Sequence, residues 1–517
     1  MKSALLISTL LAGIGLAACS TTEPNEARST IAIERVAMTP AQAGDSYYAA
    51  ASSAVKARAT KETPRRAKNI ILFVGDGMGI STLTAGRIYA GQQKGVDGES
   101  YQLSMEKMPE VALSKTYAHD GQIADSAATA TAMVTGAKVN MRTLGVSTSA
   151  RYDNCASSQG NELTTLWELA EEAGLATGIV STARITHATP ASTYAKAASR
   201  NWENDTELGA SGEGCKDIAA QLIDWPVGDG FEVVLGGGRG NFMTSDQADP
   251  EYPEKTGRRE DGRDLVAEWT GKSADHAFVW DKAGFDATDF ETDAKILGLF
   301  EPSHMQFELD REKDAAGEPS LAELTKAAIS RVSRNEDGFV LMVEGGRVDH
   351  AHHGNNAKRA LTDVGALDEA VQTALDMTDD EETLILVTAD HSHVFVIAGY
   401  SVRNNPILGK SATGIGTYNK GADGKPYTTL GYWNGPGSVC IEDDAQGRVT
   451  CLRQDLTGVD TEADNYLQQS LVPMGSETHA GEDVAIFASG PGAELVNGTM
   501  EQNEIFHVLA QSLGLTD

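Results

Sequence analysis

The chain has 517 residues and a formal net charge of −32, because 74 Asp and Glu outnumber 42 Lys and Arg. Such an acidic surface repels polyanions, which argues against electrostatic binding of nucleic acid or of an anionic membrane face, and any anion-binding site must be made locally positive. The length allows two or three domains, or one elaborated α/β domain.

The N-terminus has the pattern of an export signal. Lys2 precedes an apolar stretch, residues 4–18, that is too short to span a bilayer comfortably. Residues 16–19, Leu-Ala-Ala-Cys, resemble a bacterial lipobox, in which Cys19 is acylated and becomes the mature N-terminus; cleavage of an ordinary signal before Cys19 is the alternative. We therefore expect residues 1–19 to be a lipoprotein signal, and the protein to be exported to the cell envelope, either periplasmic or at the outer membrane.

The next segment, residues 20–62, is rich in Ala, Ser, Thr and charge, which predicts a tether followed by a short helix. From residue 63 to 517 the pattern becomes that of a folded domain. Strand patterns occupy residues 70–74, 177–180, 232–235, 339–343, 383–388 and 484–488, and helical patterns occupy residues 162–173, 321–333 and 357–374.

Strands that alternate with helices predict an α/β fold, here a doubly wound, mainly parallel central sheet with helices on both faces. Two segments break this rhythm. Residues 240–320 are loop-rich and acidic, and residues 398–435 are rich in Gly, Asn and Tyr. Both are predicted to be insertions that carry a subsite or an interface.

Four cysteines remain once Cys19 is set aside, an even number that suits an oxidising compartment. Three pairings are possible. Cys440 and Cys451 flank a segment typical of a hairpin turn, so we predict that they pair with each other and that Cys155 pairs with Cys215.

Three strand patterns end abruptly in carboxylates and imidazoles. These endings supply Asp76 after residues 70–74, Glu344, Asp349, His350 and His353 after residues 339–343, and Asp390 and His391 after residues 383–388. Ligands of parallel sheets bind beyond the carboxyl ends of the strands, so these side chains are expected to collect at one edge. Carboxylate with imidazole suits zinc, whereas carboxylate with hydroxyl and water suits magnesium.

Residue spacing favours shared metal ions. Asp349 and His353 are four residues apart and would project from one face of a helix. His479, just before the last strand pattern, can add a third ligand, and three protein ligands with one open position are typical of catalytic zinc. Asp390 and His391 are adjacent, so they can bind one ion only if the strand ends there.

Asp76 lies between two glycines, which would let its carboxylate approach and bridge two cations; a tight turn is the alternative. Ser126 is the nucleophile candidate, at the start of an Ala/Thr-rich helix. An ordinary helix cap is the alternative for Asp125 or Ser126. In the catalytic interpretation, the helix amides and dipole stabilise negative charge on a phosphorylated Ser126, and zinc replaces a histidine base.

Jointly these residues resemble the alkaline phosphatases, in particular the animal-like branch. The resemblance runs from about residue 69 to 509 and includes Asp125-Ser126-Ala127 and His187-Ala188-Thr189-Pro190. It implies a catalytic domain over residues 63–517, with a crown-like insertion at residues 398–435, that hydrolyses phosphate monoesters through a phosphoserine. It also implies two zinc ions, one magnesium ion and a homodimer.

The resemblance also implies a role for each matching residue. Asp349, His353 and His479 match the first zinc site; Asp76, Ser126, Asp390 and His391 match the second; Asp76, Thr189 and Glu344 match the magnesium site. Arg200 matches the arginine that holds two phosphate oxygens, a task suited to a planar guanidinium. His187 and His350 match positions near the magnesium site and the phosphate, where the animal-like branch has His and the enteric-bacterial type has Asp and Lys, respectively.

A calcium site is implied as well, within residues 240–320. Its matching residues are Glu251, Phe300, Glu301 and Glu318. Glu318 stands where that site usually has Asp, and an ion-pairing role for Glu318 is the alternative.

Two other functions compete with this interpretation. A phosphodiesterase or sulfatase of the same fold is the nearer, but Ser126-Ala127-Ala128 lacks the Cys/Ser-x-Pro-x-Arg signature of sulfatases, and Thr189, Glu344 and Arg200 favour monoesters over diesters. The other is a noncatalytic surface protein that binds metal or phosphate, which would need no nucleophile in line with the metal ligands.

Cys19→Ala should release the protein from membranes, because the acyl chains on Cys19 are the predicted anchor. The measurement is the distribution of the protein between membrane and soluble fractions after a carbonate wash. A variant that stays in the membrane fraction would contradict the lipoprotein interpretation.

Overall fold

The computed structural model describes residues 35–59, 65–443 and 448–516. The predicted signal with its lipobox Cys19 and the first part of the tether lie outside the described residues. Within residues 20–62 the structure has helix α1 (Ser46–Arg58), which begins at the N-cap Asp45. In the part of the chain that the structure describes, none of the helices combines the length and apolar character needed to cross a bilayer.

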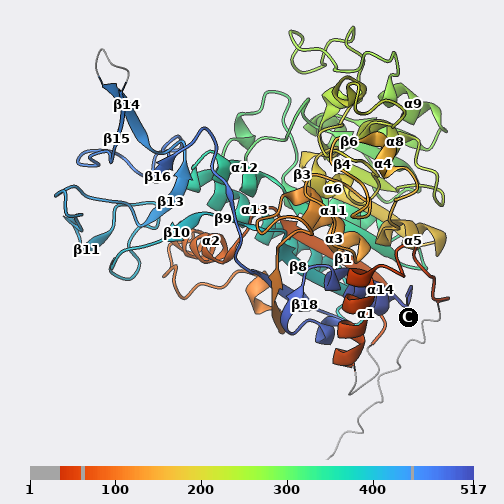
Figure 1. The fold of residues 1–517 in the computed structure, drawn as a ribbon, viewed down its shortest axis with the longest axis horizontal. Helices are drawn as coiled ribbons and strands as arrows, with labels where there is room; N and C mark the ends of the chain where they lie inside the picture. The colour runs from red at the N-terminus through yellow and green to blue at the C-terminus, as the bar shows by residue number, and fades with distance from the viewer. Residues whose placement is uncertain (1–34, 60–64, 444–447, 517) are drawn as a thin grey trace, which may run out of the picture. The chain divides into compact units, whose positions relative to one another are not determined.

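A ten-stranded sheet forms the centre of the fold, in the order β19-β2-β18-β8-β1-β7-β3-β4-β6-β5 (Figure 1). Its strands are β1 (Asn69–Gly75), β2 (Glu110–Lys115), β3 (Ala176–Arg184), β4 (Val233–Gly237), β5 (His276–Val279), β6 (Lys295–Leu299), β7 (Phe339–Gly345), β8 (Thr383–Ala389), β18 (Val484–Ser489) and β19 (Gly498–Glu501). Every pairing in it is parallel except those of β18 with β2 and β8. The predicted mainly parallel α/β sheet is confirmed.

Helices cover both faces of this sheet because its central strands are apolar on both sides. Within the described residues, the helices that follow α1 are α2 (Ile80–Gln93), α3 (Ser126–Thr135), α4 (Cys155–Ser158), α5 (Leu166–Glu172), α6 (Ala188–Ala191), α7 (Asp205–Leu208), α8 (Ile218–Ile223), α9 (Leu265–Gly271), α10 (Lys282–Ala287), α11 (Leu321–Val332), α12 (Arg347–His353), α13 (Ala357–Met377) and α14 (Glu504–Leu513). In β1, Ile70, Leu72 and Val74 join one buried cluster with residues of α3, α5 and α14, whereas Ile71 and Phe73 join another with residues of α11 and α13.

Residues 240–320 are not wholly an insertion, which corrects the sequence-based interpretation. Both β5 and β6 lie in this segment, and both extend the central sheet beyond β4. Their apolar runs are only four or five residues long and lie between acidic loops, so their pattern was too weak to identify.

A second correction concerns a helix start. The helix predicted from residue 162 begins only at Leu166, because Thr165 and Glu168 form a capping box at its N-terminus.

Residues 398–435, by contrast, contribute no strand to the central sheet. They supply β13 (Leu430–Gly435) to a three-stranded sheet, in the order β10-β13-β16, with β10 (Phe395–Ile397) and β16 (Ser470–Pro473). The small strands nearby are β9 (Ser392–His393), β11 (Ala412–Gly414), β12 (Thr417–Tyr418), β14 (Val439–Asp443), β15 (Arg448–Leu452) and β17 (His479–Ala480).

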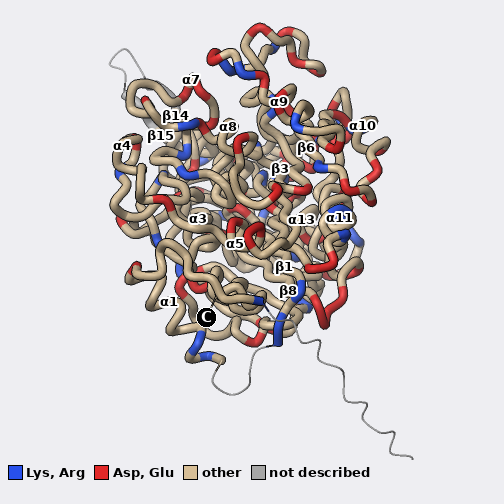
Figure 2. Tube along the Cα trace, turned by 90° about the vertical axis from the view of Figure 1, so that its right-hand side faces the viewer, with Lys and Arg blue, Asp and Glu red and all other residues tan. Residues whose placement is uncertain are grey.

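Both predicted disulfides are present. Cys155 pairs with Cys215, and Cys440 pairs with Cys451 across the β14–β15 hairpin. Structural disulfides are typical of proteins that leave the reducing cytosol. Acidic residues are spread over many segments of the trace in Figure 2, so the negative charge is not confined to one stretch of chain.

Candidate active site

The candidate ligands gather where β1, β7 and β8 end. Asp76 directly follows β1, and Asp390 directly follows β8; the register pairs Gly75 with Ala389, so the two carboxylates emerge side by side. After β7 the chain turns into α12, as predicted, and Asp349 comes from its first turn. His479 arrives from β17, which pairs with β9 next to His391.

The first ligand group consists of Asp349, His353 and His479. The distances from Asp349 Oδ1 to the Nε2 atoms of His353 and His479, and between those two Nε2 atoms, are all 3.3 Å. Ligands about 2.0–2.1 Å from a tetrahedral zinc lie roughly 3.3 Å apart, so the triangle fits one such ion.

The hydrogen bonds of the two histidines leave the correct nitrogens free. His353 Nδ1 contacts the carbonyl oxygen of Glu477 at 2.6 Å, and His479 Nδ1 contacts that of Ala124 at 2.9 Å. A carbonyl can only accept, so each neutral ring carries its proton on Nδ1 and directs an unprotonated Nε2 at the centre of the triangle.

The second ligand group consists of Asp76, Ser126, Asp390 and His391. His391 Nε2 lies 3.1 Å from Ser126 Oγ, 3.4 Å from Asp76 Oδ1 and 3.2 Å from Asp390 Oδ2. Ser126 Oγ is 3.4 Å from Asp76 Oδ1. These separations again suit a tetrahedral ion, with the serine hydroxyl as one of its ligands.

The third ligand group consists of Asp76, Thr189 and Glu344. Each has a buried oxygen without a hydrogen-bond partner in the structure: Asp76 Oδ2, Thr189 Oγ1 and Glu344 Oε1. Ligand atoms of Asp76 and Glu344 lie within 4.8 Å of each other, and Thr189 is close enough to Glu344 to influence the pKa of its carboxyl group. Unpaired buried oxygens are costly, and a cation held between these residues would satisfy them. Asp76 therefore has Oδ1 in the second group and Oδ2 free for the third, a geometry compatible with the predicted bridging of two cations.

The electrostatics of the site also call for cations. Burial, followed by the charges of Asp390 and Asp349, raises the pKa of Asp76 well above its usual value. Burial likewise raises the pKa of Glu344 to about 8. Burial works to raise the pKa of Asp349 too, but the neighbouring imidazoles, His353 first, hold it well below the usual range. Divalent ions at these positions would keep all of the carboxylates ionised.

A cavity of about 440 Å³ opens above Ser126. Its lining is Ser126, Arg184, His187, Arg200, Asn201, Glu203, His304, Asp349, His350, His353 and His479. Ser126 is the first residue of α3, and the N-cap is Asp125, whose side chain accepts from the Ala127 N–H at 3.4 Å. The serine is therefore free of the capping role.

Arg200 is held facing this cavity by two neighbours. Its Nη1 donates to Asp125 Oδ2 at 2.9 Å, and its Nη2 lies 2.9 Å from His187 Nε2. The rings of His187 and His350 are in edge contact, with centroids 5.3 Å apart. The same Asp125 carboxylate thus caps the helix of Ser126 and orients the arginine.

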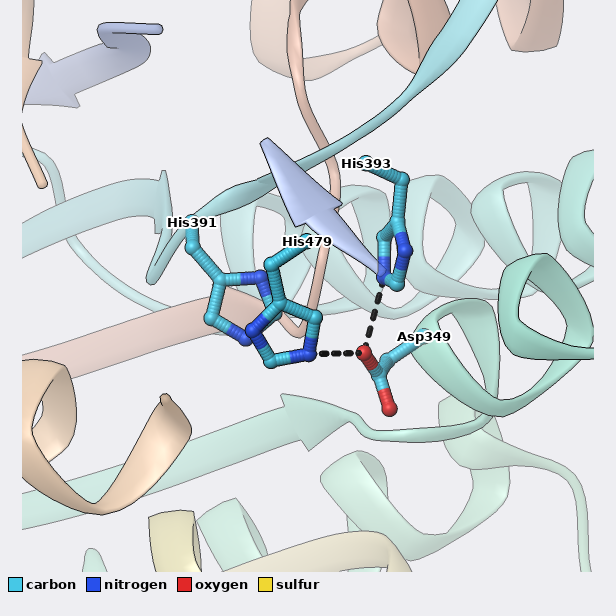
Figure 3. A group of neighbouring side chains, drawn as sticks. All are labelled: Asp349, His391, His393 and His479. Atoms are coloured by element: carbon cyan, nitrogen blue, oxygen red, sulfur yellow. Dashed lines mark hydrogen bonds and ion pairs between the residues drawn. The ribbon is translucent and has the colours of Figure 1, made fainter. Parts of the chain in front are cut away.

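Sequence reasoning missed residues that support the ligands, His393 above all. Its Nε2 donates to Asp349 Oδ1 at 2.8 Å and its Nδ1 to Glu477 Oε2 at 2.5 Å. Burial opposes the charged ring, but these two carboxylates raise the pKa of His393 to about 10. Figure 3 shows His393 and His479 both directed at Asp349, with His391 stacked on His479. The sequence did offer a signal for His393, because it follows His391 by two residues in the same segment at the end of a strand.

A fourth acidic group lies within residues 240–320. Ligand oxygens of Glu251, Glu301 and Asp314 lie within 4.8 Å of one another. Asp314 was not predicted. Glu318, which was predicted, lies outside this group but beside it: burial, then Glu301 and Asp314, raises its pKa to about 9, and its Oε2 is buried without a partner.

Gly77→Ala should reduce metal binding. Gly77 has φ +70°, and a Cβ there would lie 2.3 Å from His393 Nε2, so the ring must move away from Asp349. We expect metal affinity to weaken by about 10- to 100-fold, which is the usual effect of losing a residue that hydrogen-bonds to a metal ligand. Metal content of the purified variant, by elemental analysis, is the measurement.

Gly95→Ala is the matched control, because Gly95 has φ +71° and open space around its missing side chain. It carries the same backbone strain without the collision. Equal metal content in the two variants would show that the close packing of Gly77 on His393 does not matter for the ligands.

Comparisons with known proteins identify the family. The alkaline phosphatase family model matches residues 67–515. An alkaline phosphatase of Gadus morhua is 43% identical over 452 residues, which cover 86% of this chain and 91% of that protein. The tissue-nonspecific alkaline phosphatase of Gallus gallus is 45% identical over 454 residues, covering 86% and 84%.

The fold agrees with these matches. The crystal structure of Thermus thermophilus alkaline phosphatase superposes with a TM-score of 0.62 at 25% identity, covering 87% of this chain and 92% of that one. Since the family model spans most of the chain and curated relatives exceed 40% identity over most of their length, the chain belongs to the alkaline phosphatase family.

Proposed function

We propose that this protein hydrolyses phosphate monoesters to an alcohol and inorganic phosphate, with Ser126 as the nucleophile. The observation that carries the proposal is the position of Ser126 Oγ, which completes the second ligand group and at the same time faces the cavity beside Arg200. A noncatalytic metal- or phosphate-binding protein would have no use for a hydroxyl at that point.

The first and second ligand groups fit zinc, and the third, with two carboxylates and a hydroxyl, fits magnesium. When bound, these ions would activate the serine hydroxyl and neutralise charge on the entering and leaving oxygens. Ser126 Oγ then forms a bond to phosphorus as the ester P–O bond breaks and the alcohol departs; water cleaves the resulting phosphoserine in a second displacement.

The role proposed for Arg200 is to hold two phosphate oxygens of the substrate. Asp125 and His187 fix its guanidinium at the cavity, so little conformational entropy is lost when phosphate binds. A phosphate monoester presents two charged oxygens to such a fork, and a diester presents fewer. This favours monoesters over the phosphodiesterase alternative.

Three finer proposals go with this function. The residues proposed for a calcium site are Glu251, Glu301 and Asp314, whose ligand oxygens gather in one group, together with Glu318 beside that group and the carbonyl of Phe300. The protein is an exported lipoprotein of the cell envelope, tethered through Cys19, and it works as a homodimer, as its family resemblance implies. The acidic surface would not bind an anionic membrane face by itself, so the proposed membrane attachment depends on the lipid anchor at Cys19.

Ser126→Ala should abolish phosphoenzyme formation and leave metal content near normal, because the hydroxyl is one of four ligands in the second group. The check is labelling with a radioactive monoester, followed by acid quench and elemental analysis. Undiminished labelling would remove Ser126 from the nucleophile role.

Arg200→Ala should lower monoester kcat/KM by roughly 10- to 1000-fold, on the order of 1.4 to 4 kcal/mol, the scale for losing a charged hydrogen-bonding clamp. Diester hydrolysis should fall less. Steady-state assays with one chromogenic monoester and one diester measure both, and Arg334→Ala, a surface arginine paired with Asp293, is the control. Equal losses on both substrates would favour the phosphodiesterase.

A further inference from the structure

The small three-stranded sheet lies directly beside the first ligand group. Its strand β10 begins two residues after His393, and its strand β16 ends four residues before Glu477. Strand β13 is between them, antiparallel to β10 and parallel to β16. The insertion therefore contributes the strand that joins two segments bearing residues of the metal site.

Successive side chains of β13 point to opposite sides, as in any strand. Tyr432 and Asn434 are buried, whereas Trp433 between them is 59% exposed. Two polar side chains from this one strand thus face the protein interior, where each needs hydrogen-bond partners.

Tyr432 contacts the residue next to a ligand. Its hydroxyl lies 2.7 Å from Nδ1 of His352, which precedes His353 in α12, and the other ring nitrogen of His352 lies 2.9 Å from Thr82 Oγ1. The fully buried ring of His352 packs on His393, with centroids 4.9 Å apart. Tyr432 therefore fixes the turn of α12 that carries His353.

Asn434 contacts the residue next to the other histidine ligand. Its Oδ1 accepts from the Thr478 N–H at 3.0 Å, and its Nδ2 donates to Thr478 Oγ1 at 2.9 Å. Thr478 lies between Glu477 and His479. The Glu477 N–H also donates to the His353 carbonyl at 3.0 Å, so the two ligand segments are linked directly as well.

From these contacts we infer that β13 sets the separation of the imidazoles of His353 and His479, with Tyr432 and Asn434 as positioning residues for the first metal ion. The inference rests on the metal site proposed above. It gives the insertion a role inside the catalytic centre, since a 3.3 Å ligand triangle tolerates little movement of either segment.

The test compares Tyr432→Phe and Asn434→Ala with Trp433→Phe, a control on the same strand whose side chain points to solvent. Zinc affinity is measured by competition with a chelator and elemental analysis. We expect one of two bound zinc ions to be held about 10- to 100-fold more weakly in both variants, and unchanged in the control. Excess zinc should restore kcat for a chromogenic monoester.

The melting temperatures of the metal-free proteins separate this effect from a general loss of folding. If Tyr432 and Asn434 only position the ligands, the metal-free variants should melt at the same temperature as the metal-free wild type. Thr478→Val, which removes only the hydroxyl acceptor of Asn434 Nδ2, gives a second and milder variant. If zinc is held as tightly by all of these variants as by Trp433→Phe, the inference fails even though the wild type remains an active phosphatase. If the wild type binds two zinc ions without hydrolysing monoesters, the proposed function fails. The zinc affinities of the variants still decide whether β13 positions the first metal site.

Discussion

Repulsion between buried carboxylates is the constraint on which this structure depends. Asp76, Asp349, Asp390 and Glu344 are all buried at the ends of three adjacent strands. Parallel strands in register bring their ends to one edge, so the fold that collects the ligands also forces their charges together. Cations bound there would relieve the repulsion, so stability and catalysis would draw on the same ions.

The surrounding structure holds the groups that these ions would bind. Carbonyl oxygens of Glu477 and Ala124 select the ring nitrogen that each ligand histidine presents, and Asp125 serves both the helix of Ser126 and the guanidinium of Arg200. Such shared supports restrict the movement of the reacting groups, and catalysis by positioned groups needs a geometry held to within about 0.5 Å.

Much of the fold and most ligand candidates could be predicted because their signals are local. The apolar runs of β1, β7 and β8 and the polar residues that follow them are contiguous in the chain. The missed features depend on tertiary neighbours instead. β5 and β6 are short strands that become recognisable only beside β4, and Asp314 is one of many acidic residues in its loop until folding places it near Glu251.

The two oxygens of Asp76 have a consequence for how such a site can change over evolutionary time. One oxygen lies in the second ligand group and the other is free for the third, so this single side chain would link the two ions proposed there. A mutation of Asp76 that retunes one of these ions for a new substrate would disturb the other as well. Substitutions around the cavity mouth, away from Asp76, would therefore alter the choice of substrate with less effect on the proposed ions than substitutions of Asp76 itself.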